Sequence, residues 1–122
     1  QSFDLVIDRG AITCVGFSAG RRAVNEAARV LRSGGFFLFN PYAATHSSAA
    51  AKKRDADGLI HEITEGTLTN TGSVCFYGHE DVERAFGGGQ WVTHSFIYVE
   101  QRNIVSVRPD VHAEWRVIVS RK

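Results

Sequence analysis

The sequence predicts an α/β fold, made of a parallel βαβ unit followed by a short helix and an antiparallel strand pair. Two short apolar runs, at 3–8 and 35–40, flank a stretch in which apolar and small residues recur at helical spacing. Two further runs with strand composition, 93–101 and 113–122, end the chain. A chain of 122 residues has the size of one small domain, so we expect a single core.

The first apolar run, Phe3 to Asp8, is short and nearly continuous, which is typical of a strand buried on both faces. A helix follows it, and Ser18 is a suitable N-cap for that helix. Gly34 and Gly35 are expected to end the helix, and a second strand then runs to Asn40. Strand, helix, glycine and strand within about 35 residues predict a βαβ unit with a right-handed crossover.

The middle of the chain is less regular. Residues 44–58 mix small and charged side chains, and we interpret them as a mobile loop or lid with a helical turn. The strand-like segments 59–66 and 73–78 are separated by a turn-prone stretch, which predicts a hairpin. Residues 79–86 carry acidic side chains in a first helical turn and end at the glycine run 87–89, so a short helix is expected there.

Composition and charge argue against several classes of protein. With 43% hydrophobic and 22% charged residues, the chain has the composition of a globular domain. Its 14 basic and 13 acidic residues give a net charge of +1, and the basic residues do not gather in one tract. We therefore expect no nucleic-acid partner. Because no apolar run approaches the ~20 residues of a membrane span, we expect no membrane partner either.

The cysteines and histidines predict no metal centre. Cys14 and Cys75 are too few for a disulfide scaffold or a zinc ligand set, and a reducing, cytoplasmic setting is the plain expectation. Four histidines lie on separate predicted elements, and none of them forms an i, i+4 helical pair of the kind that binds metal. They are His61, His79, His94 and His112.

The order of the motifs resembles the second half of the class I methyltransferases that use S-adenosylmethionine (SAM). In that family the fourth strand often reads like FDLVID at 3–8 and leads into a loop like RGAITCV at 9–15. A helix ending like ARVLRSGG at 28–35 and a strand like FFLFN at 36–40 then follow. HAEWRVIVSRK at 112–122 resembles the antiparallel seventh strand of this fold.

The sequence departs from the family in one respect. It has no GxGxG loop after a first strand and no acidic residue at the end of a second strand. The glycine run 87–89 cannot substitute for the GxGxG loop, because it follows a helix instead of joining a strand to one. The resemblance therefore implies a partial Rossmann-like methyltransferase sheet that lacks the first three strands. Residues 1–122 are interpreted as the C-terminal portion of a single methyltransferase domain, an excerpt of a longer protein.

The resemblance also implies where the cofactor lies. In open α/β sheets, ligands bind beyond the carboxyl ends of the strands. The loop after the first strand would lie near the methionine and sulfonium part of SAM, where Asp8 could accept a hydrogen bond from the ammonium group and Gly10 would allow a close approach. The alternative is that Asp8 only caps the strand end and Arg9 is solvated. The predicted cofactor-binding residues are Asp8, Arg9 and Gly10.

Acceptor binding is predicted at the end of the next strand. Asn40 offers a donor and an acceptor, and Tyr42 can stack on a substrate or hydrogen-bond to it. Alternatively, Asn40, Pro41 and Tyr42 form a structural turn. His46 follows in the loop and is the candidate general base, since an unperturbed imidazole titrates near pH 6.5. The alternative for His46 is a solvated loop position.

Three functional hypotheses follow. The first is SAM-dependent methyl transfer to a small-molecule acceptor by the intact protein, with this chain alone binding SAM weakly or not at all and lacking activity. The second is a non-catalytic interaction or regulatory module that forms a homodimer or domain swap through the exposed strand edge at Phe3. The third is another doubly wound enzyme such as a nicotinamide-dependent reductase, against which the terminal antiparallel strands argue.

Overall fold

The computed structural model of the chain describes residues 2–50, 53–108 and 110–122. Its helices and main strands follow one another in the order that the sequence predicts. The elements are β1 (Phe3–Ile7), the 3₁₀ turn η1 (Ile12–Cys14), α1 (Phe17–Val30), β2 (Leu31–Phe39), the 3₁₀ turn η2 (Ser47–Ala50), β3 (Leu59–Ile60), β4 (Val74–Cys75), α2 (His79–Ala85), β5 (Trp91–Arg102) and β6 (Val111–Arg121).

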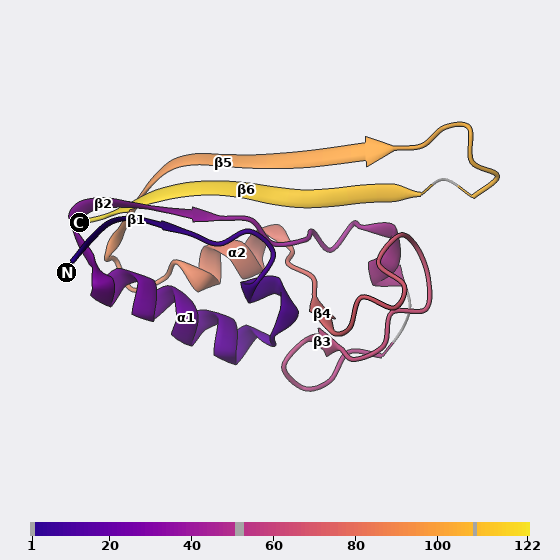
Figure 1. Cartoon of the computed structure of the whole chain (residues 1–122), viewed down its shortest axis with the longest axis horizontal. Coiled ribbons are helices and arrows are strands. Elements are labelled where there is room, and N and C mark those ends of the chain that lie inside the picture. Colours follow the sequence, from indigo (N-terminus) through magenta and orange to yellow (C-terminus); the bar gives the residue numbers. More distant parts are fainter. Residues whose placement is uncertain (1, 51–52, 109) are drawn as a thin grey trace.

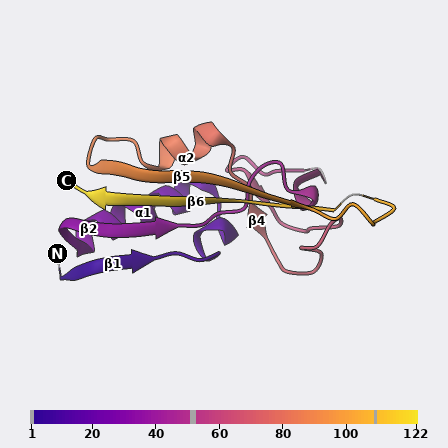
Figure 2. The ribbon, with the colours of Figure 1, turned by 90° about the horizontal axis from the view of Figure 1, so that it is seen from above.

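Four strands form one sheet in the order β1-β2-β6-β5 (Figure 2). β1 and β2 are parallel and joined through α1, whereas β6 is antiparallel to both β2 and β5. The last strand of the chain therefore lies between β2 and β5, and β1 forms one edge of the sheet. This mixed sheet confirms the predicted fold class.

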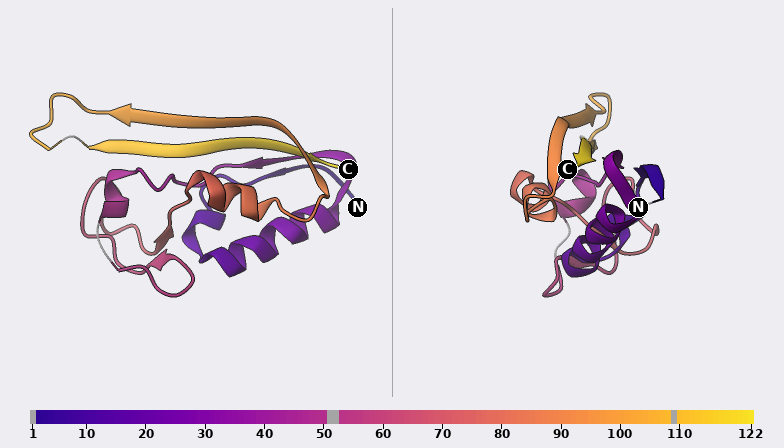
Figure 3. Two further views of the ribbon diagram at one scale, coloured as in Figure 1. Left: turned by 180° about the vertical axis from the view of Figure 1, so that it is seen from behind. Right: turned by 90° about the vertical axis from the view of Figure 1, so that its left-hand side faces the viewer.

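Both helices cover the same face of the sheet, as the end-on view shows (Figures 1 and 3). Phe37 and Phe39 of β2 point to this face and are buried, and they pack against Phe86 and Trp91 with ring centroids 5.5–6.0 Å apart. Edge-to-face and tilted contacts at such distances are favourable for aromatic rings. The core therefore lies between the sheet and α1 and α2.

The opposite face of β1 is not covered, so the expectation of a strand buried on both faces is wrong. Phe3, Leu5 and Ile7 are 56%, 48% and 61% exposed, while Val6 packs against the core. Side chains alternate between the two faces of a strand, and in the described chain only the face of Val6 meets the helices. An apolar run thus indicates a strand here without specifying what covers it.

The boundaries of α1 also differ from the prediction. Gly16 occupies the N-cap position, and Ser18 lies inside the first turn, where its backbone N–H and its hydroxyl both donate to the Asp57 carboxylate. The helix ends at Val30 without a glycine cap, and β2 begins at Leu31. Gly34, with φ of 78°, lies within β2, where the pairing with β1 shifts register. The glycine pair thus forms a bulge rather than a helix stop.

The middle segment forms a small second sheet. β3 pairs antiparallel with β4 over two residues each, which confirms the predicted hairpin in a shorter form. Within the predicted loop 44–58, η2 is the helical turn, and residues 51 and 52 lie outside the described residues. The mobility of this loop, and its role as a lid, stay predictions.

β5 and β6 form a long hairpin that extends beyond the rest of the molecule (Figure 1). Three β-branched side chains lie at its tip, and they are almost fully exposed: Ile104, Val105 and Val107. Among the described residues, no helix combines the length and the apolarity needed to cross a membrane.

Candidate functional site

The loops that follow β1 and β2 meet the first residues of β6 at one end of the sheet. Parallel strands end on the same side, and the antiparallel β6 begins where β2 ends. The Trp115 backbone N–H donates to the Pro41 carbonyl at 2.9 Å, and Tyr42 forms an isolated bridge with Glu114. Three chain segments that are far apart in sequence therefore build one site.

Asp8 is buried at the end of β1, with 6% of its surface exposed. Its Oδ1 accepts the backbone N–H groups of Ala11 and Ile12 at 3.0 and 2.9 Å, so the carboxylate caps η1. Its Oδ2 is buried and has no hydrogen-bond partner within the described chain. A buried carboxylate oxygen without a donor is costly, and a bound donor group would relieve that cost.

Gly10 adopts a φ of 82°, which is favourable only for glycine, and it reverses the chain between β1 and η1. The turn is tied to the end of β2 through Thr13, which is fully buried. The Thr13 hydroxyl donates to the Cys75 carbonyl at 2.8 Å and accepts the Tyr42 N–H at 3.3 Å. The loop of Arg9 and Gly10 is therefore anchored to the residues where acceptor binding is predicted.

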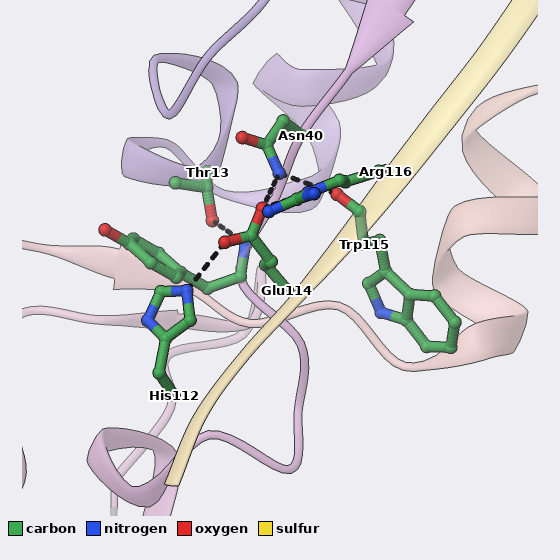
Figure 4. Close-up of polar contacts among 7 residues, drawn as sticks. Thr13, Asn40, His112, Glu114, Trp115 and Arg116 are labelled. Carbon is green, nitrogen blue, oxygen red and sulfur yellow. Dashed lines mark hydrogen bonds and ion pairs between the residues drawn. The ribbon is translucent and has the colours of Figure 1, made fainter. Parts of the chain in front are cut away.

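Asn40 lies between β2 and β6. Its Nδ2 donates to Glu114 Oε2 and to the Trp115 carbonyl, both at 2.7 Å (Figure 4). Both amide hydrogens are thereby used, so the group that Asn40 can offer a ligand is Oδ1, which points away from Glu114 (Figure 4). Pro41 is buried and supplies its carbonyl to the sheet, and Tyr42 is half-buried.

Three ionisable side chains at the start of β6 complete the site. His112, Glu114 and Arg116 are spaced by two residues and share the sheet face that α1 and α2 leave open. His112 Nε2 lies 2.6 Å from Glu114 Oε1, and Arg116 Nε donates to Glu114 Oε2 at 3.1 Å (Figure 4). Glu114 therefore links three side chains, because Asn40 also donates to it.

Glu114 is ionised at neutral pH. Burial alone would raise its pKa, but hydrogen bonds from His112, Asn40 and Arg116 outweigh burial and lower the pKa to about 2. Because the carboxylate keeps its charge, it acts only as a hydrogen-bond acceptor.

The sequence interpretation missed these three residues. It placed 112–122 in a closing strand and grouped His112 with scattered histidines, without considering which face each side chain occupies. The available signal was the alternation of ionisable residues with Ala113 and Trp115, which has the period of two that strands impose.

His46, the predicted general base, is 2% exposed and packs against Tyr42, Phe76 and His112. Its Nδ1 accepts the Ser48 N–H at 3.0 Å, and its buried Nε2 has no partner within the described chain. Burial, and then the charge of His112, lower its pKa to about 4, partly offset by Asp110. The base role stays a prediction, but these contacts favour a structural one, since the lone pair of Nδ1 is already engaged.

A cleft of about 510 Å³ opens at this end of the sheet, and it adjoins a smaller hollow of about 210 Å³. Arg9, Asn40 and Glu114 line both, so they are two parts of one site. The cleft has an apolar wall from β1, β2 and β6, and the hollow is lined by polar groups. The cleft is also lined by Ile7, Asp8, Leu38, Phe39, Arg116, Val117 and Ile118, and the hollow by Gly10, Tyr42 and His112.

Another hollow, of about 320 Å³, lies on the helix side of the molecule between α1 and α2. It contains none of the predicted cofactor or acceptor residues. Within residues 2–50, 53–108 and 110–122, no three His, Cys, Asp or Glu side chains gather in a way that could hold a metal ion. The strand-end cleft is therefore the candidate site.

Comparison with known proteins agrees with this arrangement. The sequence model of the family described as a methyltransferase domain matches residues 1–39. A SAM-dependent methyltransferase from Methanosarcina mazei aligns with 98% of this chain, with a TM-score of 0.69 and 14% sequence identity. The chain therefore has a fold similar to that of the SAM-dependent methyltransferases. A structure from a study of the conversion of a disulfide bond into a thioacetal group during echinomycin biosynthesis aligns with 98% of the domain, with a TM-score of 0.62 and 20% identity.

The methyltransferase-like domain spans only part of those structures. It covers 59% of the archaeal chain and 49% of the other. A search of curated proteins finds no match. At these identities the structural likeness establishes the fold, whereas activity, acceptor and partners require separate evidence.

Proposed function

We propose that the protein carrying this domain transfers a methyl group from SAM to a small molecule bound in the strand-end cleft. The observation that supports this most strongly is the site itself, in which polar groups from β1, β2 and β6 converge on a cleft at the carboxyl ends of parallel strands. That is where open α/β sheets bind their ligands. SAM dependence is supported by the methyltransferase family match and the structural neighbours.

The residues after β1 are suited to one part of SAM. Asp8 presents a buried carboxylate oxygen that has no donor among the described residues, and a cationic amine is the kind of group that satisfies such an oxygen. Gly10 brings the backbone to the adjoining hollow without a side chain, and Arg9 lines both the hollow and the cleft. We assign Asp8, Arg9 and Gly10 to the amino-acid and sulfonium end of SAM. The described chain contains no glycine-rich loop between a strand and a following helix that would hold the adenosine end of SAM.

The acceptor would lie against the end of β2. Asn40 offers its Oδ1, and Tyr42 forms one wall of the hollow. Leu38, Val117 and Ile118 supply an apolar surface that excludes water from the bound acceptor. SAM, when bound, supplies an electrophilic methyl group on a good leaving group, so the contribution of these residues is mainly to position the acceptor.

We expect the domain alone to bind SAM weakly or not at all, and the complete protein to bind it and transfer methyl groups. The physical reason is that the groups present here contact only one end of the cofactor. Calorimetric titration with SAM, and transfer of a radiolabelled methyl group to a panel of small acceptors, measure the two properties. In the complete protein, Asp8→Asn should weaken SAM binding about tenfold, the effect of losing roughly one charge-assisted hydrogen bond.

The control is Asp4→Asn, which changes an exposed aspartate of the same strand outside the cleft. Micromolar binding of SAM by the domain alone would contradict the first expectation. A complete protein that binds SAM normally but methylates none of the acceptors would contradict the proposed activity.

A second candidate function is self-association through β1. This strand is an edge of the described sheet, and three of its five side chains are exposed and apolar. An uncovered strand edge with an apolar face favours pairing with another strand. We propose that two copies pair antiparallel through β1, which would extend the sheet and bring the exposed side chains of Phe3, Leu5 and Ile7 into cross-strand contact.

Leu5→Lys is therefore expected to convert a dimer of this chain into a monomer, because it places a charge at the centre of the proposed interface. Light scattering after size-exclusion chromatography gives the mass directly. The matched control is Ile104→Lys, at the hairpin tip, where an exposed apolar side chain lies far from β1. A wild-type chain that remains monomeric at high micromolar concentration would contradict this second function.

A further inference from the structure

We propose that His112 is the general base of this site, held by Glu114, and that the acceptor is a phenolic hydroxyl compound. The inference rests on the proposed methyl transfer and specifies its substrate class. The residues that support it lie on β6 and in the loop after β2.

The contact between the two side chains determines which nitrogen of His112 is available. Nε2 lies 2.6 Å from Glu114 Oε1, and an ionised carboxylate can only accept a hydrogen bond. Nε2 of the neutral ring must therefore carry the proton, which leaves a lone pair on Nδ1. A carboxylate behind an imidazole fixes the tautomer and stabilises the ring once it takes up a proton.

Glu114 is itself fixed in place. Asn40 holds its Oε2 from the loop after β2, and Arg116 holds the same oxygen from two residues along β6. The side chain thus has partners on both oxygens and little freedom to turn away from His112. Glu114 is a positioning residue, and Asn40 and Arg116 support it.

His112 also lies where a substrate can reach it. Its side chain is 32% exposed, and it lines the hollow together with Arg9, Gly10 and Tyr42. The hollow adjoins the cleft at the end of β1, so an acceptor there lies between the imidazole and the loop assigned to the sulfonium end of SAM. By contrast, His46 is almost fully buried behind His112.

The chemistry of this pair favours an acceptor that must lose a proton. A thioether or a tertiary amine already has a free lone pair and needs no base. A phenol, which titrates near pH 10 as tyrosine does, is mostly protonated at neutral pH but lies within about four pH units of an imidazole. The apolar wall of Leu38, Val117 and Ile118 suits an aromatic ring.

In the proposed step, the O–H bond of the acceptor breaks, its proton passes to Nδ1 of His112, and the electron pair stays on the oxygen that becomes methylated. SAM supplies the methyl group and leaves as S-adenosylhomocysteine. The imidazolium, stabilised by Glu114, then releases its proton to water, which restores the neutral ring.

Several other charged or titratable groups face His112 or its partners and would influence its titration. Tyr42 and His46 contact the ring, and Arg9 lines the same hollow. Arg116 pairs with Glu114, and Asp110 acts on the neighbouring His46. A pH profile therefore has to be compared between variants rather than interpreted alone.

The first test needs no cofactor. Nitrogen NMR of this chain at neutral pH should show His112 as a single tautomer with its proton on Nε2. Glu114→Ala should give a mixture of tautomers, Glu114→Asp should partly restore the Nε2–H form, and Glu65→Ala, an exposed position outside the cleft, should leave it unchanged. A wild-type His112 with its proton on Nδ1 would overturn the inference while leaving the proposed function intact.

The second test uses the complete protein with SAM and simple phenols. His112→Asn should lower kcat/KM at least about 100-fold, in the range of general-base contributions, and should flatten the rise of the rate with pH. SAM affinity should stay within about twofold. His61→Asn, which changes an exposed histidine, is the control.

The outcomes separate the two proposals. A complete protein that binds no SAM overturns the proposed function, and this inference with it. Normal SAM binding with methylation of thioethers or tertiary amines but not of phenols overturns the inference alone, as does an unchanged rate and pH profile in His112→Asn. Circular dichroism of each variant verifies that the fold is intact.

Discussion

Replacing Phe37 with alanine is expected to lower the free energy of unfolding by about 3–5 kcal/mol, the range found for fully buried phenylalanines. Phe37 is 0% exposed and lies at the centre of the aromatic cluster, with ring centroids 5.8–6.0 Å from those of Phe39, Phe86 and Trp91. Truncation leaves a cavity between the sheet and α2 that three large rings cannot fill without moving. Denaturant unfolding of the chain, followed by circular dichroism, measures the loss.

The neighbouring Phe36 provides a matched control. It has the same side chain on the same strand but points to the other face, where it is 43% exposed and has a tilted contact with His94. Phe36→Ala should cost no more than about 1 kcal/mol. If Phe37→Ala does not fold, Phe37→Leu should still be less stable than wild type. Equal losses for the two alanine variants would contradict the assignment of the core to the helix face of the sheet.

The difference between Phe36 and Phe37 also shows how far the sequence could predict this fold. Apolar runs and helical spacing predicted every major element and the parallel pairing of β1 with β2. They could not predict which face of each strand is covered, because FFLF reads as continuously apolar whichever way it points. Gly34 was misread for a similar reason, since a glycine after a helical pattern can either end the helix or form a bulge in the next strand.

The site was predictable only in part. The rule that ligands lie beyond the ends of parallel strands directed attention to the residues after β1 and β2, which line the candidate site. What it could not supply was the register of β6, which is set by contacts between segments more than 70 residues apart, such as that of Asn40 with Glu114. Without that register, His112 and Glu114 are simply two residues in a strand. The structure therefore shows which residues of the antiparallel strand β6 lie beside the loops after β1 and β2.

This chain aligns with only part of each structural neighbour, and that bears on the face of the sheet that the helices leave open. The domain aligns over nearly its whole length with about half to three fifths of those chains. The uncovered side chains of β1 lie on the same face as the cleft, so whatever covers them also approaches the candidate site. We therefore expect the proposed association through β1 and the proposed SAM binding to influence each other, and experiments on one should monitor the other.

Lowering the pH from about 6.5 to about 4 is expected to destabilise the chain through His46, by at most about 3 kcal/mol. The pKa of His46 in the folded chain is about 4, because burial disfavours the charged ring, whereas an unfolded histidine titrates near 6.5. Between these values the unfolded chain binds the proton and the folded chain does not. The stability linked to His46 is thus complete above pH 6.5, falls as the pH decreases towards 4, and is constant below that.

Denaturant unfolding of wild type and His46→Asn between pH 7 and pH 3.5 isolates this contribution, because protonation of the carboxylates affects both proteins alike. Asparagine keeps an acceptor for the Ser48 N–H but does not titrate, so the variant should be less stable at pH 7 and lose less stability on acidification. His61→Asn, at an exposed histidine, should keep the wild-type dependence of the unfolding free energy on pH above pH 5. A His46→Asn slope equal to that of wild type would mean that the imidazole titrates normally in the folded chain, and the buried position of His46 beneath His112 would then be wrong.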